Sequence, residues 1–297
     1  MINFFPSPDA EMTIHHTEKR WTTVIDANAN RSVSRMRELW KARDLIFLFV
    51  RRDFVTFYKQ TILGPLWFFI QPLMTTLVFT VIFGRIANIP TDGIPPFLFY
   101  MSGIILWTYL SSCIEKTSTI FVEQQAVFSK VYFPRLSVPV SIVISKVFSF
   151  GIQFVTFLGF LIYYAVTGAD IHFHWWAILI VPLLLAYVAI LAISIGLTVS
   201  ALTTKYRDLA FMVTFGVQLW MYATPIVYPM SQAPDRLKWA LAFNPMSAPI
   251  EIFRFAFLGN GQIFIPAIVA GLVITSALAI TGAKLFSSAE KTFVDTI

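Results

Sequence analysis

Residues Trp175 to Leu202 read WWAILIVPLLLAYVAILAISIGLTVSAL and contain no charged side chain. A helix of roughly 20 mainly apolar residues is long enough to cross the hydrocarbon core of a bilayer. This stretch therefore predicts a membrane-spanning helix.

Over the whole chain, hydrophobic residues make up 57% and charged residues 13%, whereas soluble domains contain roughly 25% charged residues. Together with a mean hydropathy of +0.71, this composition predicts an integral membrane protein of all-α fold.

Further apolar stretches bring the number of predicted spans to six, and they divide the chain into four parts. The predicted parts are a cytoplasmic N-terminal extension (1–44), an amphipathic interface helix (45–62), a six-span transmembrane domain (63–285) and a cytoplasmic tail (286–297). The spans are predicted at Leu63–Phe83, Phe97–Ile114, Leu136–Val166, Trp175–Leu202, Leu209–Tyr228 and Ile263–Leu285.

The distribution of basic residues predicts that both termini lie in the cytoplasm. The first sixty or so residues lack an apolar run followed by a small-residue cleavage site, so a removable signal peptide is not expected. Most of the 22 Lys and Arg residues then fall on the inside, with Arg85, Arg236, Lys238 and Arg254 outside, as the positive-inside rule requires. The net charge of +6 thus reflects topology, and no nucleic-acid partner follows. Because Cys113 is the only cysteine, an intrachain disulfide is excluded.

The helix expected before the first span is amphipathic. Its apolar stripe is predicted to consist of Phe47, Val50, Phe54, Phe57 and Tyr58, a spacing typical of a helix that lies in the membrane interface. On the opposite face Arg52 and Lys59 project in nearly the same direction, and Arg51 flanks them. Two interpretations remain open: a membrane-surface anchor, or a site at headgroup depth that binds a lipid pyrophosphate.

A polar and aromatic segment, FVEQQAVFSKVYFPR from Phe121 to Arg135, separates the second and third spans. We call it the coupling segment, because its polar residues and aromatic anchors suit docking of a separate cytoplasmic subunit. A short loop, Thr203–Asp208, is the other inside connection. The residues expected to contact that subunit are Phe121, Glu123, Gln124, Gln125, Phe128, Lys130 and Arg135, with Lys205, Arg207 and Asp208 of the loop.

The outside segment Pro229–Gln262 is long and divided by several prolines. Loops of that length without secondary structure are uncommon. We therefore expect short re-entrant helices, near Leu237–Phe243 and Ile250–Phe257, that enter the outer leaflet before the last span.

The chain contains no Gly-x4-Gly-Lys-Ser/Thr, Gly-x-Gly-x-x-Gly or His-Glu-x-x-His motif, so neither an ATP site nor a catalytic zinc site of those kinds is expected. His172 and His174 lie beside Trp175-Trp176 and fit an interfacial belt better than a metal site. Glu115 and Lys146 lie near the ends of their spans. As charged groups in spans they are functional candidates, although snorkelling or mutual pairing is the simpler interpretation.

Aromatic residues are numerous: 30 Phe, 10 Tyr and 8 Trp. Two groups, in the second and fifth spans, lie at mid-to-outer depth. Aromatic rings can line a path for sugars, and packing within the bundle is the alternative for each ring. The candidate channel-lining residues are Tyr100, Trp107, Tyr109, Trp220 and Tyr222.

Four motifs, occurring in order alongside the predicted spans, resemble the permease subunit of type-2 ABC exporters. More narrowly, they resemble the polysaccharide branch that exports O-antigen, capsule or teichoic acid. The likeness extends from Leu45 to the end of the chain. The motifs are Arg51-Arg-Asp-Phe-x4-Lys-Gln-Thr-Ile-Leu-Gly-Pro-Leu-Trp67, Phe133-Pro-Arg135, Tyr206-Arg-Asp-Leu209 and Tyr222-Ala-Thr-Pro-Ile-Val-Tyr228.

The resemblance implies a homodimer bound to two copies of a separate nucleotide-binding subunit. That subunit would bind ATP and Mg, so this chain would carry no cofactor and would not itself be an enzyme. The resemblance also implies a polysaccharide carried on undecaprenyl pyrophosphate through a channel between two permeases in the bacterial inner membrane. By this likeness Phe121–Tyr132 matches the coupling helix, Thr203–Asp208 the second cytoplasmic contact, Arg51–Gln60 the interface helix and Pro229–Gln262 the outer gate helices.

Two other functions remain as alternatives. An exporter of the same family for a small drug or lipid would need less aromatic lining and no pyrophosphate site. An intramembrane transferase or hydrolase would need a cluster of converging acids, bases or nucleophiles, and the predicted spans do not show one.

Overall fold

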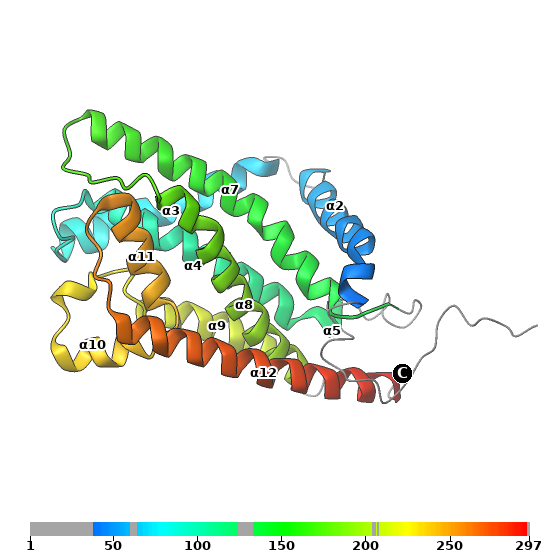
Figure 1. Cartoon of the computed structure of the whole chain (residues 1–297). Coiled ribbons are helices and arrows are strands. Elements are labelled where there is room, and N and C mark those ends of the chain that lie inside the picture. Colours follow the sequence, from blue (N-terminus) through cyan, green and yellow to red (C-terminus); the bar gives the residue numbers. More distant parts are fainter. Residues whose placement is uncertain (1–37, 60–63, 124–132, 204–205, 207, 296–297) are drawn as a thin grey trace, which may run out of the picture.

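The computed structural model describes residues 38–59, 64–123, 133–203, 206 and 208–295 (Figure 1). This part of the chain is helical and contains no strand. Its elements are α2 (Arg43–Lys59), η1 (Gly64–Leu66), α3 (Trp67–Phe79), η2 (Thr80–Ile86), α4 (Pro96–Ser118), α5 (Ile120–Glu123), α7 (Ser137–Val166), α8 (Ala177–Thr203), α9 (Leu209–Tyr222), η3 (Met230–Gln232), α10 (Asp235–Ala242), α11 (Ser247–Leu258) and α12 (Ile265–Asp295).

Five helices in the described part are long and apolar enough to cross a membrane, which confirms a multi-pass membrane protein. They are Trp67–Ile86, Pro96–Ser118, Ser137–Val166, Ala177–Thr203 and Ile265–Ala289. The predicted fifth span is shorter than expected, because α9 ends at Tyr222 after 14 residues. At 1.5 Å per residue it extends roughly 21 Å, less than the roughly 30 Å of a hydrocarbon core. The six-span count is therefore not confirmed.

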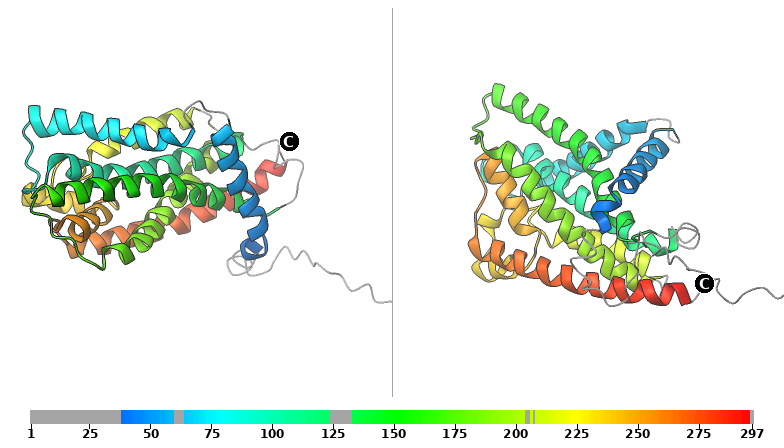
Figure 2. Two further views of the ribbon diagram at one scale, coloured as in Figure 1. Left: turned by 90° about the horizontal axis from the view of Figure 1, so that it is seen from above. Right: turned by 45° about the vertical axis from the view of Figure 1, so that its right-hand side comes forward.

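The helices lie side by side between two ends of the molecule (Figures 1 and 2). At one end lie α2, α5 and the carboxyl end of α12, and we call it the α5 end. At the other end lie α10 and α11, and we call it the α11 end. The predicted outer segment thus does contain short helices, α10 and α11, close to the two ranges expected from sequence.

The centre of the bundle is α4, which packs against α3, α7, α8, α9 and α11. In the most apolar part of α4, 78% of the residues are buried inside the bundle. The corresponding share is 17% for the span that contains α3 and 22% for α12. Two of the glycines mark places where neighbouring helices approach each other closely. A Cβ at Gly196 of α8 would lie 2.5 Å from Thr117 Cβ, and one at Gly282 of α12 would lie 2.5 Å from Ser194 O. Small residues allow such close approach in membrane helices generally.

Helix α2 packs on α7, and residues both inside and outside the predicted apolar stripe lie against the bundle. Phe49, which the stripe omits, is the buried residue, at 8% exposure, whereas Phe47 is 71% exposed. Phe49 contacts Phe133 with ring centroids 5.8 Å apart, and Phe54 contacts Phe148 of α7 edge-on at 4.8 Å. The contact with the bundle thus includes Phe54 of the predicted stripe, whereas Phe47 of the same stripe is exposed, and the placement of the stripe in the membrane interface stays a prediction.

Candidate functional site at the α5 end

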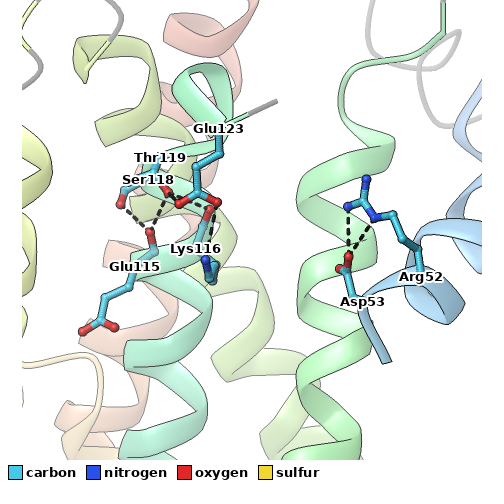
Figure 3. Close-up of polar contacts among 7 residues, drawn as sticks. All are labelled: Arg52, Asp53, Glu115, Lys116, Ser118, Thr119 and Glu123. Carbon is cyan, nitrogen blue, oxygen red and sulfur yellow. Dashed lines mark hydrogen bonds and ion pairs between the residues drawn. The ribbon is translucent and has the colours of Figure 1, made fainter. Parts of the chain in front are cut away.

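The start of the coupling segment is a short turn joined to the end of α4. Lys116 Nζ lies 3.4 Å from Glu123 Oε2, and Thr119 Oγ1 donates to Glu123 Oε1 at 2.9 Å. Ser118 Oγ donates to the carbonyl of Glu115 at 2.8 Å, which closes the last turn of α4 (Figure 3). The Lys116–Glu123 pair is exposed, and such pairs contribute only about 0–1 kcal/mol. Its main effect is to hold the carboxylate of Glu123 in a fixed orientation.

Phe121, one of the residues predicted to contact the partner subunit, is buried within its own chain. Its side chain is fully buried, at 0% exposure, and its ring contacts Phe286 of α12 with centroids 4.9 Å apart. It belongs to a small core with Ile120, Val138 and Leu197. Since truncation of a buried Phe typically costs about 3–5 kcal/mol, Phe121 anchors the coupling segment to its own chain. The surface at this turn comes instead from neighbours such as Val122, which is 46% exposed.

The same turn is also attached to α8. Thr203, the last residue of α8, donates its hydroxyl to the carbonyl of Ser118 at 2.9 Å. Thr203 is also where the second predicted contact, Thr203–Asp208, begins. The start of the second contact segment is therefore bonded to the last residue of α4, three residues before the coupling segment. The close approach of Gly196 to Thr117 lies in the same helix pair.

The other residues predicted to contact a partner fall into two groups. Arg135 is half-buried beside the start of α7, and Asp208 is exposed at the start of α9, where its carbonyl accepts from Phe211 N at 3.0 Å. The rest lie outside the described residues, namely Gln124, Gln125, Phe128, Lys130, Lys205 and Arg207.

On α2, Arg51 and Arg52 are exposed. Arg52 donates to Asp53 Oδ1 from Nη2 at 2.9 Å and from Nε at 3.1 Å (Figure 3), and its guanidinium lies 5.0 Å from the centre of the Phe49 ring. Part of its hydrogen-bonding capacity is thus used within α2. Helix α2 ends at Lys59, whose side chain lies outside the described part.

Among the candidate channel-lining aromatics, three are packed inside the bundle, which was the alternative left open. Tyr100, Trp107 and Tyr109 are 0%, 5% and 3% exposed. Trp107 packs against Trp220 of α9 with ring centroids 5.3 Å apart. Tyr222 differs, because it is 47% exposed. Only this last ring presents a large free surface within one chain.

The charged and histidine candidates have ordinary structural surroundings. Lys146 of α7 lies within electrostatic reach of Asp53 and Glu115. His172 Nδ1 lies 3.7 Å from Asp170 Oδ1, and the His174 ring stacks on Phe255 at 5.1 Å. The described residues contain no group of three or more His, Cys, Asp or Glu side chains that could hold a metal.

Sequence reasoning missed one polar cluster, at the α11 end. Glu251 and Arg254 form a buried ion pair, with side chains 4% and 1% exposed and an Oε1–Nη1 distance of 3.2 Å. The available signal was the spacing of three residues, which places both charges on one face of an otherwise apolar helix. The charge pattern alone places Arg254 among the basic residues predicted on the outside and gives it no partner.

A bundle that contains five helices long and apolar enough to cross a membrane defines a multi-pass membrane protein. The chain belongs to the ABC-2 type transporter family, whose model matches residues 44–258. It is 25% identical over 253 residues to the O-antigen export system permease protein RfbA of Klebsiella pneumoniae, covering 85% of this chain and 94% of that protein. It is 24% identical over 267 residues to the protein of the same name from Myxococcus xanthus, covering 88% and 98%. These matches confirm the predicted family and its polysaccharide branch.

Proposed function

We propose that this chain is the channel-forming subunit of an ATP-driven exporter that moves a lipid-pyrophosphate-linked polysaccharide across the bacterial inner membrane. The observation that carries the proposal is the similarity, over nearly their whole length, to relatives named as O-antigen export permeases. Membership of the ABC-2 type family supports the same transport class.

The active assembly in this proposal is a homodimer with two copies of a nucleotide-binding subunit that binds ATP and Mg. In the proposed homodimer a second copy packs on two apolar surfaces that face lipid in a single chain. On α3, Leu77 and Val78 are each 48% exposed, and on α9, Phe211 and Phe215 are 83% and 63% exposed. In this arrangement the α5 end faces the cytoplasm, so that both termini lie there.

Force from the nucleotide-binding subunit would enter through the coupling segment. Movement of α5 would reach α12 through the Phe121–Phe286 contact. Movement of the end of α4, which directly precedes α5, would reach α8 through the Thr203–Ser118 hydrogen bond. The lipid pyrophosphate would bind at α2 through Arg51, Arg52 and Lys59, because charge-assisted bonds from guanidinium and ammonium groups suit phosphate oxygens. Tyr222, which is 47% exposed, would contact the sugar chain on its path.

Deletion of the gene in its host tests this proposal. Export of a lipid-linked polymer predicts that the polymer disappears from the cell surface and accumulates inside, still joined to its lipid. A complementing copy of the gene should restore it to the surface. Unchanged surface polymer would reject the proposal and favour export of a small drug or lipid. A polymer of altered composition, still at the surface, would favour an intramembrane transferase.

A further inference from the structure

The residues that follow α9 form a turn buried between α4 and α11. Within Thr224–Val227, Thr224 and Ile226 are 0% exposed and Val227 is 6% exposed. The turn lies so close to α4 that a Cβ at Gly103 would be 3.1 Å from Ile226 Cγ2. Because the carbonyls of a buried turn cannot reach water, they require donors from within the protein.

Arg254 of α11 supplies those donors. Its Nη1 donates to Pro225 O at 2.6 Å, and its Nη2 donates to Ile226 O at 3.0 Å. It also reaches α4, where Nε donates to Ser102 Oγ at 3.2 Å and the guanidinium lies 3.7 Å from the centre of the Phe99 ring. A planar guanidinium with five N–H groups in a fixed fork can satisfy several acceptors at once, which an ammonium on a flexible stem does not do.

Glu251 compensates the buried charge and extends the connection. Its Oε1 accepts from Arg254 Nη1 at 3.2 Å, and its Oε2 accepts from Gln262 N at 2.8 Å. Burial lowers the pKa of Arg254 to about 10, and Glu251 opposes that shift. Arg254 therefore stays protonated at neutral pH and keeps all its donors.

Asn244 makes a second connection to the end of α9. Its Nδ2 donates to Ala223 O at 3.2 Å and to Thr224 Oγ1 at 2.9 Å. Its Oδ1 accepts from Trp220 Nε1 at 3.2 Å and from Met246 N at 3.0 Å. The last turn of α9 and the residues after it are thus tied to the segment that leads into α11.

The rest of α9 has few such contacts. In α9 itself Val217 is the buried residue, while Phe211, Met212 and Phe215 are 83%, 63% and 63% exposed. One end of this helix is therefore fixed by buried polar bonds, and the remainder is lightly packed against its own chain.

We infer that Arg254, assisted by Asn244, is a positioning residue that fixes the α11 end of α9, so that α9 pivots about Thr224–Val227. The use of this movement rests on the proposed function: a displacement produced at the α5 end would tilt α9 while its α11 end stays against α4 and α11. The fixed end itself does not depend on which substrate is transported.

Distances between spin labels in the full chain test this inference. In a Cys113→Ala background, one label pair at Ala223→Cys and Leu179→Cys reports on the α11 end. A second pair at Met212→Cys and Leu202→Cys reports on the α5 end. The chain is placed in lipid nanodiscs with excess unlabelled chain, so that each measured pair lies within one molecule. The expected result is a narrow distance distribution for the first pair and a broad one for the second.

Arg254→Lys keeps the positive charge but loses the planar array of guanidinium donors. It should therefore broaden the distance distribution of the label pair at the α11 end. Asn244→Ala removes a half-buried amide and should broaden the same distribution to a smaller degree. This variant still tests the inference if Arg254→Lys does not fold. Arg236→Lys, an exposed position on α10, is the matched control and should change nothing. The inference is overturned if the α11-end pair is as broad as the α5-end pair in the unmodified chain, or if Asn244→Ala and any folded Arg254→Lys leave it narrow. Because no polymer or ATP is present, a negative result contradicts only the fixed end of α9 and says nothing against the proposed function.

Discussion

Gly196→Ala adds one methyl group where α8 crosses α4, seven residues before Thr203. The added Cβ would lie 2.5 Å from Thr117 Cβ and 2.7 Å from Thr117 Cγ2, so the two helices must separate locally. Overpacking of this kind costs about 1–3 kcal/mol. Replacing a helical glycine by alanine also stabilises the folded chain by about 0.5–1 kcal/mol, because alanine loses less conformational entropy on folding. A matched control is needed to subtract this gain.

Gly159→Ala in α7 is that control, because a Cβ there meets no atom within 4 Å. The two variants share the gain from replacing glycine, so their difference in free energy of unfolding isolates the overpacking term of about 1–3 kcal/mol. At about 2–4 °C per kcal/mol for domains of 150–250 residues, Gly196→Ala should unfold roughly 2–12 °C below Gly159→Ala in a thermal melt of purified protein in detergent. Equal melting temperatures would refute the close packing of α4 on α8.

Three further predictions concern the missing ATP site, the coupling segment and α2. The purified chain alone should hydrolyse no ATP, and hydrolysis should appear only with a nucleotide-binding subunit; measurable activity of the pure chain would contradict the division of roles. Phe128→Asp should uncouple ATP hydrolysis from export or dissociate the subunits, and intact assembly with normal export would argue against docking there. Phe121→Ala should instead lower the melting temperature of the isolated chain, because Phe121 is buried within that chain. Replacing Arg52 and Lys59 together by Gln should abolish stimulation of ATPase by lipid-linked polymer at equal membrane levels, because charged hydrogen bonds are worth about 1.5–3 kcal/mol each; unchanged stimulation would leave α2 as a membrane anchor.

Hydropathy predicted the long spans well, because bilayer thickness imposes a minimum length on an apolar helix. The predicted range Leu136–Val166 corresponds to α7, and Trp175–Leu202 to α8, within a few residues. The end of α9 was predicted wrongly for a physical reason. Thr224–Val227 is apolar enough to continue a span, and the distant side chain of Arg254 bonds two of its carbonyls, those of Pro225 and Ile226, in the buried turn.

The candidate site was predicted only in part, for a similar reason. The existence of a short polar connection between spans is a local property of the sequence, and Glu123 indeed lies at an exposed turn. The direction of an aromatic side chain in that turn is not local. Phe121 faces inward because Phe286, far along the chain, provides its partner.

Translocation in proteoliposomes tests the central claim most directly. The chain and its nucleotide-binding subunit are reconstituted with lipid-linked polysaccharide, and polymer that has crossed the membrane is measured with and without ATP. The proposed function predicts ATP-dependent transfer of the lipid-linked polymer, absent without the chain and absent with the nucleotide-binding subunit inactivated. ATP hydrolysis without any transfer of the polymer, while a small drug or a free lipid is transferred instead, would contradict it.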